Sequence, residues 1–398
     1  MADTTSDAQS AQPEVEPLPR LDVPVQPPVE PMLAQLTRDL PLTDGWLFEP
    51  KWDGFRALVF FDGNGMVIQS RDLRPLGRYF PELEEGLRQN LKPGMVVDGE
   101  IVIASPTGLD FDALLLRIHP AASRIKMLAR KTPSSFVAFD LLAADGLDLT
   151  SSPISERRRR LETLMADVEP PIYLTPATTD RARAAEWFER FEGAGLDGVV
   201  AKRLDSLYVP GQRAMLKIKH QRTADCVVGA FRWNRGQVGT SVGSLALGLY
   251  DKEGRLHHVG FTSAFKAAEK RELVEFLKPY RELDPDRPGF SWLEGEMLAR
   301  ESSAGQNRWS GGQSRWSHGK EALDWLPLRP DLVCEVAFDH WQGDVEPSDH
   351  HGWLGAGRFR HGTTFLRWRT DKPPEHCTFD QLTFAVPIEL DEVFGTRS

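Results

Sequence analysis

A lysine in an acidic segment with a glycine turn is the first candidate for covalent chemistry. Lys51 lies within Glu-Pro-Lys-Trp-Asp-Gly-Phe-Arg, residues 49–56. A lysine amine shifts its pKa readily when it is buried and can then act as a nucleophile. Asp53 and Gly54 favour a tight turn, and Arg56 carries the fork of N–H donors that matches a phosphate. By itself, this short pattern is equally typical of a hairpin with solvated charges.

Carboxylates interrupt a second segment, the apolar strand expected at Val96–Val102. Asp98 and Glu100 stand inside it, and carboxylates of this kind suit a divalent metal or ribose hydroxyl groups. The alternative, a surface turn within the strand, is the better interpretation of this segment when it is taken alone.

Two further segments carry alternating cations. Lys217 and Lys219 are two residues apart near the strand expected at 215–218, so their side chains point to one face. Two ammonium groups on one face repel each other unless an anion lies between them, and phosphate is the obvious anion. Arg367 and Arg369 repeat this spacing near the C-terminus. A solvated basic edge strand is the simpler interpretation of either pair alone.

Together and in this order, the four segments resemble the covalent nucleotidyltransferase superfamily of ATP-dependent DNA ligases and mRNA capping enzymes. Within it, the chain looks most similar to the small bacterial ligases of the ligase C type and to the ligase domain of the end-joining ligase D. Residues 70–72 resemble the second motif of the superfamily, and residues 136–142 resemble its adenine-stacking strand.

The resemblance implies a role for each matching residue. Lys51 would attack the α-phosphate of ATP and form a lysyl-AMP intermediate. The residues that would contact ATP or a phosphate of the nick are Glu49, Arg56, Arg71, Glu100, Phe139, Arg213, Lys217, Lys219, Arg369 and Lys372. Glu100 and Asp197 would bind Mg²⁺ or Mn²⁺, although the family usually has Glu at the position of Asp197. Asp371 belongs to the same C-terminal motif as Arg369 and Lys372.

The activity that the resemblance implies is the sealing of nicks in duplex DNA, through lysyl-AMP and a DNA-adenylate, in DNA repair. We expect a monomer in the cytoplasm, with a repair polymerase or end-binding proteins as further partners and no membrane association. The alternatives are an RNA ligase, a capping-type nucleotidyltransferase and a non-catalytic protein that binds DNA ends.

These residues need a fold that mixes antiparallel strands with helices, and the sequence pattern predicts the α+β class. The resemblance implies an ATP-grasp-like nucleotidyltransferase domain at residues 31–222 and an OB-fold β-barrel domain at residues 223–398. In the second of these, about five strands and one helix at 266–280 suit a small barrel. Residues 1–30 are rich in Pro, Ala, Ser, Thr and acids, so we expect a disordered acidic tail.

The net charge of −10 excludes a uniformly basic surface for nucleic acids. Half of this charge lies in residues 1–30, and residues 31–222 are neutral. DNA binding therefore needs local basic patches, for which residues 124–131 and 213–222 are the candidates. The sequence has no apolar run long enough for a bilayer and no secretory signal. Its three cysteines are far apart and lack zinc spacing.

Overall fold

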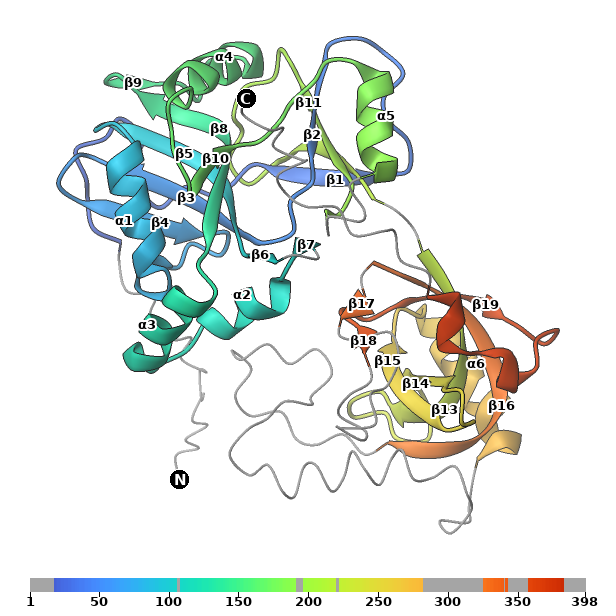
Figure 1. The fold of residues 1–398 in the computed structure, drawn as a ribbon. Helices are drawn as coiled ribbons and strands as arrows, with labels where there is room; N and C mark the ends of the chain where they lie inside the picture. Colours follow the sequence, from blue (N-terminus) through green and yellow to red (C-terminus); the bar gives the residue numbers. More distant parts are fainter. Residues whose placement is uncertain are drawn as a thin grey trace, which may run out of the picture. The chain divides into compact units, whose positions relative to one another are not determined.

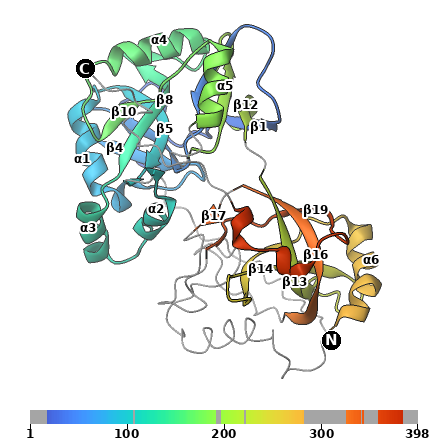
Figure 2. The same cartoon turned by 45° about the vertical axis from the view of Figure 1, so that its right-hand side comes forward.

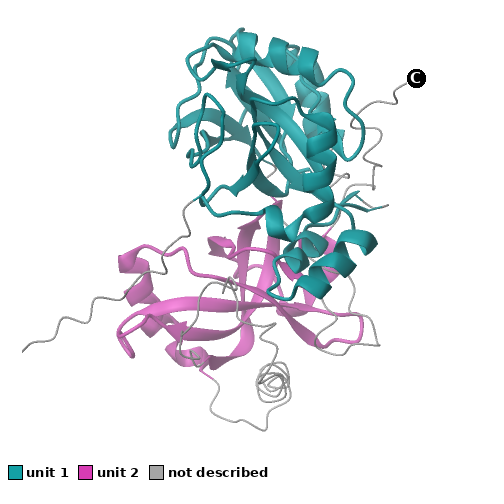
Figure 3. Cartoon of the chain, turned by 90° about the vertical axis from the view of Figure 1, so that its left-hand side faces the viewer, with its two compact units in different colours: residues 1–219, 385–398 teal, residues 220–384 magenta. Residues whose placement is uncertain are grey.

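The structure is a computed structural model that describes residues 18–105, 108–190, 196–219, 222–281, 325–339, 341–342 and 357–382. The described chain forms two units that divide after Lys219 (Figure 3), where the sequence had led us to expect a boundary after Arg222. Both units combine β-sheets with helices (Figures 1 and 2), which confirms the predicted α+β class.

A largely antiparallel sheet forms the centre of unit 1. Its strands are largely apolar, and a turn at residues 62–65 joins the first two of them in the sequence, β3 and β4. Across the sheet, the strands follow the order β10 (Ile172–Leu174), β8 (Ser135–Ala144), β5 (Met95–Val102), β3 (Phe55–Phe61) and β4 (Met66–Ser70), and β9 (Leu147–Asp148) pairs with β8.

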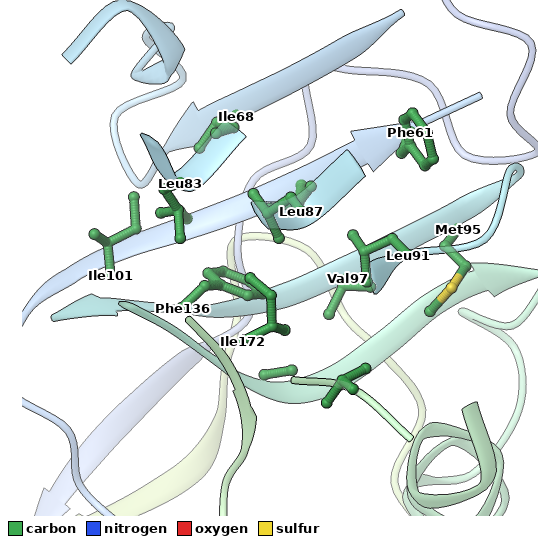
Figure 4. Close-up of a cluster of buried hydrophobic side chains, with 14 of the residues drawn as sticks. Phe61, Ile68, Leu83, Leu87, Leu91, Met95, Val97, Ile101, Phe136 and Ile172 are labelled. Carbon is green, nitrogen blue, oxygen red and sulfur yellow. The ribbon is translucent and has the colours of Figure 1, made fainter. Parts of the chain in front are cut away.

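Helix α1 (Pro81–Asn90) covers one face of this sheet. Pro81 at its first turn is pre-set for a helix, and Glu82 and Glu84 favour the positive N-terminal end of the helix dipole. Leu83 and Leu87 are four residues apart, so they lie on one helix side, and both are fully buried against the sheet (Figure 4).

The described part of unit 1 also contains the helices η1 (Gly77–Tyr79), α2 (Phe111–Arg117), α3 (Ala122–Lys131), α4 (Ile154–Leu164) and α5 (Arg181–Arg190). A short hairpin of β6 (Ala104–Ser105) and β7 (Gly108–Leu109) precedes α2. No helix among the described residues is long and apolar enough to cross a bilayer.

Unit 1 also contains a four-stranded sheet, in which alternate residues of each strand point to opposite faces. Phe48, Val199, Ala201 and Ile218 form a buried cluster with Ala184 of α5 on one face. The residues between them in the sequence therefore point to the opposite face. The strand order is β1 (Leu33–Thr37), β12 (Arg213–Ile218), β11 (Val199–Arg203) and β2 (Trp46–Pro50).

Residues 18–30 correct the prediction of a disordered tail. Val23 and Val25 are buried, with exposed fractions of 6% and 9%. The Val29 N–H donates to Gln69 Oε1 at 2.9 Å, and Gln69 Nε2 donates to the Val29 carbonyl at 2.6 Å. Several prolines restrict this segment before folding, so a few buried valines offset the small entropy that it loses. Residues 1–17 of the predicted tail lie outside the described residues.

The described residues of unit 2 form a five-stranded antiparallel sheet and one α-helix, as the sequence predicted. Bulges in the long strand β13 shift its register against both neighbours, and such shifts bend a sheet toward a barrel. The order is β15 (Leu256–Thr262), β14 (Val242–Tyr250), β13 (Arg222–Trp233), β16 (Leu326–Phe338) and β19 (Thr364–Trp368).

The smaller elements of unit 2 are α6 (Ala267–Leu277), the pair β17 (Trp341–Gln342) and β18 (Arg358–Phe359), and the 3₁₀ helices η3 (Lys278–Tyr280), η5 (Pro374–His376) and η6 (Phe379–Gln381). The predicted helix at 266–280 is therefore α6 followed by η3. Residues 383–398 of the predicted OB domain lie outside the described residues.

Candidate functional site

A pocket of about 350 Å³ in unit 1 is lined by residues of both sheets. Much of its wall is charged, which is unusual for a ligand site because most such sites are largely apolar. The residues singled out from the sequence that line it are Glu49, Lys51, Arg56, Arg71, Glu100, Phe139, Arg213 and Lys217.

Lys51 is held in place by the backbone of the loop between β2 and β3. Its N–H donates to the Gly198 carbonyl at 2.8 Å, and the Asp197 N–H donates to the Lys51 carbonyl at 2.9 Å. The next residue, Trp52, donates its indole N–H to Thr175 Oγ1 at 2.8 Å. These bonds present the lysine side chain to the pocket.

Two glycines allow the close approach of the elements around Lys51. Gly198 has a φ of +120°, and a Cβ atom there would collide with the Ile218 carbonyl. A Cβ atom on Gly54 would collide with the Ile101 carbonyl at the end of β5. Both positions therefore require glycine for the lysine loop to pack this tightly.

Asp197 joins the nucleophile candidate to a second lysine. Lys51 Nζ and Lys219 Nζ lie 2.5 Å and 2.7 Å from the same carboxylate oxygen of Asp197, whose side chain is 7% exposed. The sequence suggested that Lys217 and Lys219 share one strand face. In the structure, Lys217 lines the pocket from β12, whereas Lys219 lies just beyond the strand and contacts Asp197.

Lys217 lies in a strongly positive environment. Burial lowers its pKa first, and repulsion from Lys219 and Lys51 lowers it further, with Arg71 also contributing. Arg71 and Arg213 are exposed side chains that line the same pocket. Such a group of cations is stabilised by a bound polyanion, so this part of the wall suits phosphates.

Phe139 and Glu49 provide an aromatic face and a buried acceptor in the same pocket. Lys202 links them: its Nζ lies 2.8 Å from Glu49 Oε2, 3.0 Å from the Phe139 carbonyl and 4.8 Å from the centroid of the Phe139 ring. Glu49 and Lys202 are each 2% exposed. A planar base that stacks on Phe139 would place its edge near a carboxylate that cannot turn away.

Lys202 is a pocket residue that the sequence analysis missed. It stands in β11, where Val199 and Ala201 belong to the buried cluster against α5. Strict alternation puts Val200 and Lys202 on the opposite face, and both line the pocket. The alternation of this strand was therefore a signal that could have identified Lys202.

Arg56 is held at the pocket wall by hydrogen bonds to other residues of the protein. Its Nε and Nη2 donate to the two carboxylate oxygens of Asp98 at 2.9 Å and 2.6 Å, and its Nη1 donates to the Met32 carbonyl at 2.8 Å. Tyr208 donates its hydroxyl to Asp98 at 2.8 Å. Asp98 and Tyr208 thus orient the Arg56 guanidinium, which lies 5.1 Å from the centroid of the Phe139 ring. The sequence did not reveal that these two residues support Arg56.

Glu100 has an unusual protonation equilibrium. Burial raises its pKa from the ordinary 4.5 to about 8, although the nearby charges of Lys51 and Arg56 oppose this shift. Between these two pH values, the folded protein holds a proton that the unfolded chain releases. Rising pH through this window therefore lowers the free energy of unfolding.

A Glu100→Gln variant tests this charge state, because it removes the titration. Its melting temperature relative to the wild type is expected to rise by about 8–16 °C between about pH 5 and pH 8, because each pH unit in this window lowers the wild-type free energy of unfolding by about 1.4 kcal/mol and each kcal/mol shifts the melting temperature of a unit of this size by about 2–4 °C. Calorimetry of the full chain without nucleotide measures the difference. The matched control is Glu85→Gln, at an exposed position of α1, which should give a pH-independent difference. The same flat profile for Glu100→Gln would contradict the assignment.

The two residues predicted to bind metal both lie beside Lys51. Asp197 contacts the lysine directly, and Glu100 interacts with it electrostatically. Within the described part of the chain, no group of three or more His, Cys, Asp or Glu side chains could hold a metal ion. Two carboxylates still fit Mg²⁺, which commonly takes one or two of them and completes its shell with water and substrate phosphates.

The C-terminal cations meet at one acid within unit 2. Arg369 Nη1 lies 2.8 Å and Lys372 Nζ lies 2.9 Å from Asp225 Oδ2. Arg369 also pairs with Asp371, and this bond lowers the pKa of Asp371 to about 2. The pairing of Arg369 and Lys372 with Asp225 was not visible in the sequence.

Two family models match most of the chain. Residues 31–219 match the ATP dependent DNA ligase domain, and residues 238–372 match the ATP dependent DNA ligase C terminal region. The first match contains the pocket, and the second contains Arg369 and Lys372.

Two curated relatives match this chain over nearly their whole length, and a third matches it over part of its length. DNA ligase C2 of Mycolicibacterium smegmatis is 47% identical over 366 residues, which cover 91% of this chain and 96% of the relative. DNA ligase C of Mycobacterium tuberculosis is 44% identical over 380 residues, which cover 94% and 99%. The LigD end-joining repair protein of M. tuberculosis is 30% identical over 311 residues, which cover 77% of this chain and 36% of that protein.

A solved structure of a Lig E DNA ligase shares the fold, with a TM-score of 0.50 at 17% identity and coverage of 85% of this chain and 99% of the other. The α+β architecture with a nucleotidyltransferase domain followed by an OB-fold domain is thereby confirmed. With two family models and relatives at 44–47% identity, the chain belongs to the ATP-dependent DNA ligases, a family of enzymes.

Proposed function

We propose that this protein seals nicks in duplex DNA through a lysyl-AMP at Lys51 and a DNA-adenylate. The observation that carries the proposal is the position of Lys51. It stands in a pocket with a phosphate-binding wall at Arg71, Arg213 and Lys217, and with an aromatic ring and a fixed carboxylate to hold a base. Family membership favours this activity over an RNA ligase, a capping enzyme or a non-catalytic end-binding protein.

In the first step, the Lys51 amine attacks the α-phosphorus of ATP. A P–N bond forms, the bond from the α-phosphorus to its bridging oxygen breaks, and pyrophosphate leaves with the electron pair. Lys51 has to lose a proton before its lone pair can attack, and Asp197 is the carboxylate in contact with it. Lys217 supplies positive charge where negative charge grows on the phosphoryl oxygens.

Adenine would stack on Phe139 with its amino group toward Glu49, because a carboxylate accepts hydrogen bonds and Lys202 keeps it oriented. Glu100 and Asp197 would hold Mg²⁺ or Mn²⁺, which when bound supplies charge that neutralises the triphosphate. In the later steps, AMP passes to the 5′-phosphate of the nick, and the 3′-hydroxyl then displaces it.

The function is tested by incubating the protein with α-labelled ATP or GTP and then with a nicked duplex. We expect label on the protein from ATP, its transfer to the 5′-phosphate and a sealed strand. Sealing of a DNA/DNA nick beside an RNA/DNA nick distinguishes a DNA ligase from an RNA ligase. Label retained from GTP alone would contradict the proposal.

We propose that helix α3 contributes to the grip on DNA. Lys126, Arg130 and Lys131 are exposed on it beside Met127, whose exposed fraction is 50%. A cationic helix face of this kind attracts phosphates regardless of base sequence. Such a local basic patch would allow a protein with a negative net charge to bind DNA.

Replacing Lys126, Arg130 and Lys131 together by alanine is expected to weaken nick binding and to flatten its salt dependence. The slope of log affinity against log salt should fall by up to about three, because each phosphate contact contributes about 0.9. Fluorescence anisotropy with a labelled nick measures both effects. Arg159→Ala is the control, since Arg159 already pairs with Glu156. An unchanged slope in the triple variant would exclude this surface.

A role in DNA repair is supported by the similarity to LigD, a protein named for end joining and repair. We propose a cytoplasmic monomer that works with a repair polymerase or with end-binding proteins. Neither the partners nor the subunit count enters the adenylation chemistry, which needs residues of this chain alone.

A further inference from the structure

Arg369 and Lys372 of unit 2 share a single carboxylate. Arg369 Nη1 lies 2.9 Å and 2.8 Å from the two oxygens of Asp225, and Lys372 Nζ lies 2.9 Å from Oδ2. Asp225 stands in β13, and the two cations follow it in the sequence by 144 and 147 positions. The fold has therefore brought two distant cations to one oxygen atom.

The position of Asp225 is fixed by hydrogen bonds of its backbone. Its N–H donates to Gln381 Oε1 at 2.7 Å, and Gln381 Nε2 donates back to the Asp225 carbonyl at 3.0 Å. In the sheet, Asp225 lies directly opposite Glu335 of the neighbouring strand β16, and the Asp225 side chain is 12% exposed. By contrast, Asp371, the other carboxylate on Arg369, is 65% exposed.

Without a shared anion, the two cations would not stay together. Each nitrogen lies within 2.9 Å of Asp225 Oδ2, so the two positive groups are no more than about 6 Å apart and repel each other. Arginine and lysine side chains are long and flexible, and repulsion would separate them. A substrate anion would then have to gather them before it could use both.

We propose that Asp225 is a positioning residue for adenylation, which gathers Arg369 and Lys372 into one cationic pair that receives the pyrophosphate of ATP. The inference rests on the proposed ligase activity and on the contact with ATP that the family resemblance implies for these two cations. As the P–N bond to Lys51 forms, the electron pair of the breaking bond goes to pyrophosphate, and the cationic pair stabilises the negative charge of this leaving group. Asp225 acts through the two cations and does not touch the substrate.

Asp225→Asn tests this role, because it keeps the shape but removes the charge that bridges the cations. We expect kcat/KM for adenylation to fall about tenfold to a hundredfold. The reverse reaction, in which inorganic pyrophosphate takes the AMP group from Lys51 and re-forms ATP, should slow by a similar factor, because it uses the same leaving-group site. Sealing of a pre-adenylated nick should stay unchanged. Equal losses in all three reactions, or no loss at all, would overturn the inference.

Glu335→Gln is the matched control, because Glu335 lies directly opposite Asp225 and binds Arg367 at 2.6 Å instead. It should leave all three reactions unchanged. Asp225→Glu keeps the charge and should recover part of the loss, which guards against a folding defect in the asparagine variant.

Arg369→Ala separates this inference from the proposed function beneath it. Loss of adenylation in Arg369→Ala but not in Asp225→Asn would overturn the role of Asp225 alone. Full adenylation by Arg369→Ala would instead overturn the proposed function of the cations.

Discussion

A Lys51→Ala variant is expected to form no covalent AMP adduct when it is incubated with ATP, whereas the wild type gains the mass of one AMP. The loss should be at least about a thousandfold in adenylation rate, because the nucleophile itself is removed and no other group can replace its covalent bond. Intact-protein mass spectrometry measures it. An adduct that survives the substitution would refute Lys51 as the nucleophile.

Lys51→Arg separates the loss of nucleophilicity from a loss of local structure. Arginine can keep the ion pair with Asp197, but its guanidinium is always protonated and cannot attack. It should therefore be as inactive as alanine in adenylation. Both variants should still seal a nick that already carries AMP, because that step does not use the lysine as a nucleophile. Lys92→Ala, at an exposed position of the same unit, is the control that should remain fully active.

Lys217→Met is expected to lower the adenylation rate by about a hundredfold to a thousandfold, the cost of removing one preorganised charge from a developing transition state. Methionine keeps much of the apolar stem and removes only the ammonium group. This group lies among Lys219, Lys51 and Arg71, and its pKa is lowered there by burial and by their repulsion. The positive charges of this cluster repel one another, and the phosphates of bound ATP reduce that repulsion. The loss should therefore appear in kcat as well as in KM.

The rate of adenylate formation at several ATP concentrations separates these two parameters. Lys217→Arg retains the charge and should recover part of the rate, and Lys92→Ala again serves as the control. If Lys217→Met adenylated at the wild-type rate, the phosphate wall would have to lie elsewhere in the pocket.

Much of the fold followed from local patterns. The strand at 96–102, and the five strands and the helix of unit 2, were predicted because apolar periodicity acts over short distances in the chain. Residues 18–30 were misjudged for the same reason. Composition alone does not show that Val23 and Val25 meet the buried face of a sheet.

The same distinction between local patterns and long-range contacts applies to the candidate site. The order of the motifs predicted Lys51, Phe139 and Lys217 as site residues, since each motif is local, and all three line one pocket in the structure. Lys202 was missed because its importance depends on Glu49 and Phe139, which come from other strands.

The sequence by itself thus determined the family, the fold class and the residues that could do chemistry. Only the tertiary structure decided which charges are paired: Lys51 with Asp197, and Arg369 and Lys372 with Asp225. The physical reason is that strand register, not residue type, sets such contacts. Lys51, Asp197, Arg369 and Lys372 lie close to the ends of strands in the sequence, so the pairing of those strands brings these distant positions together.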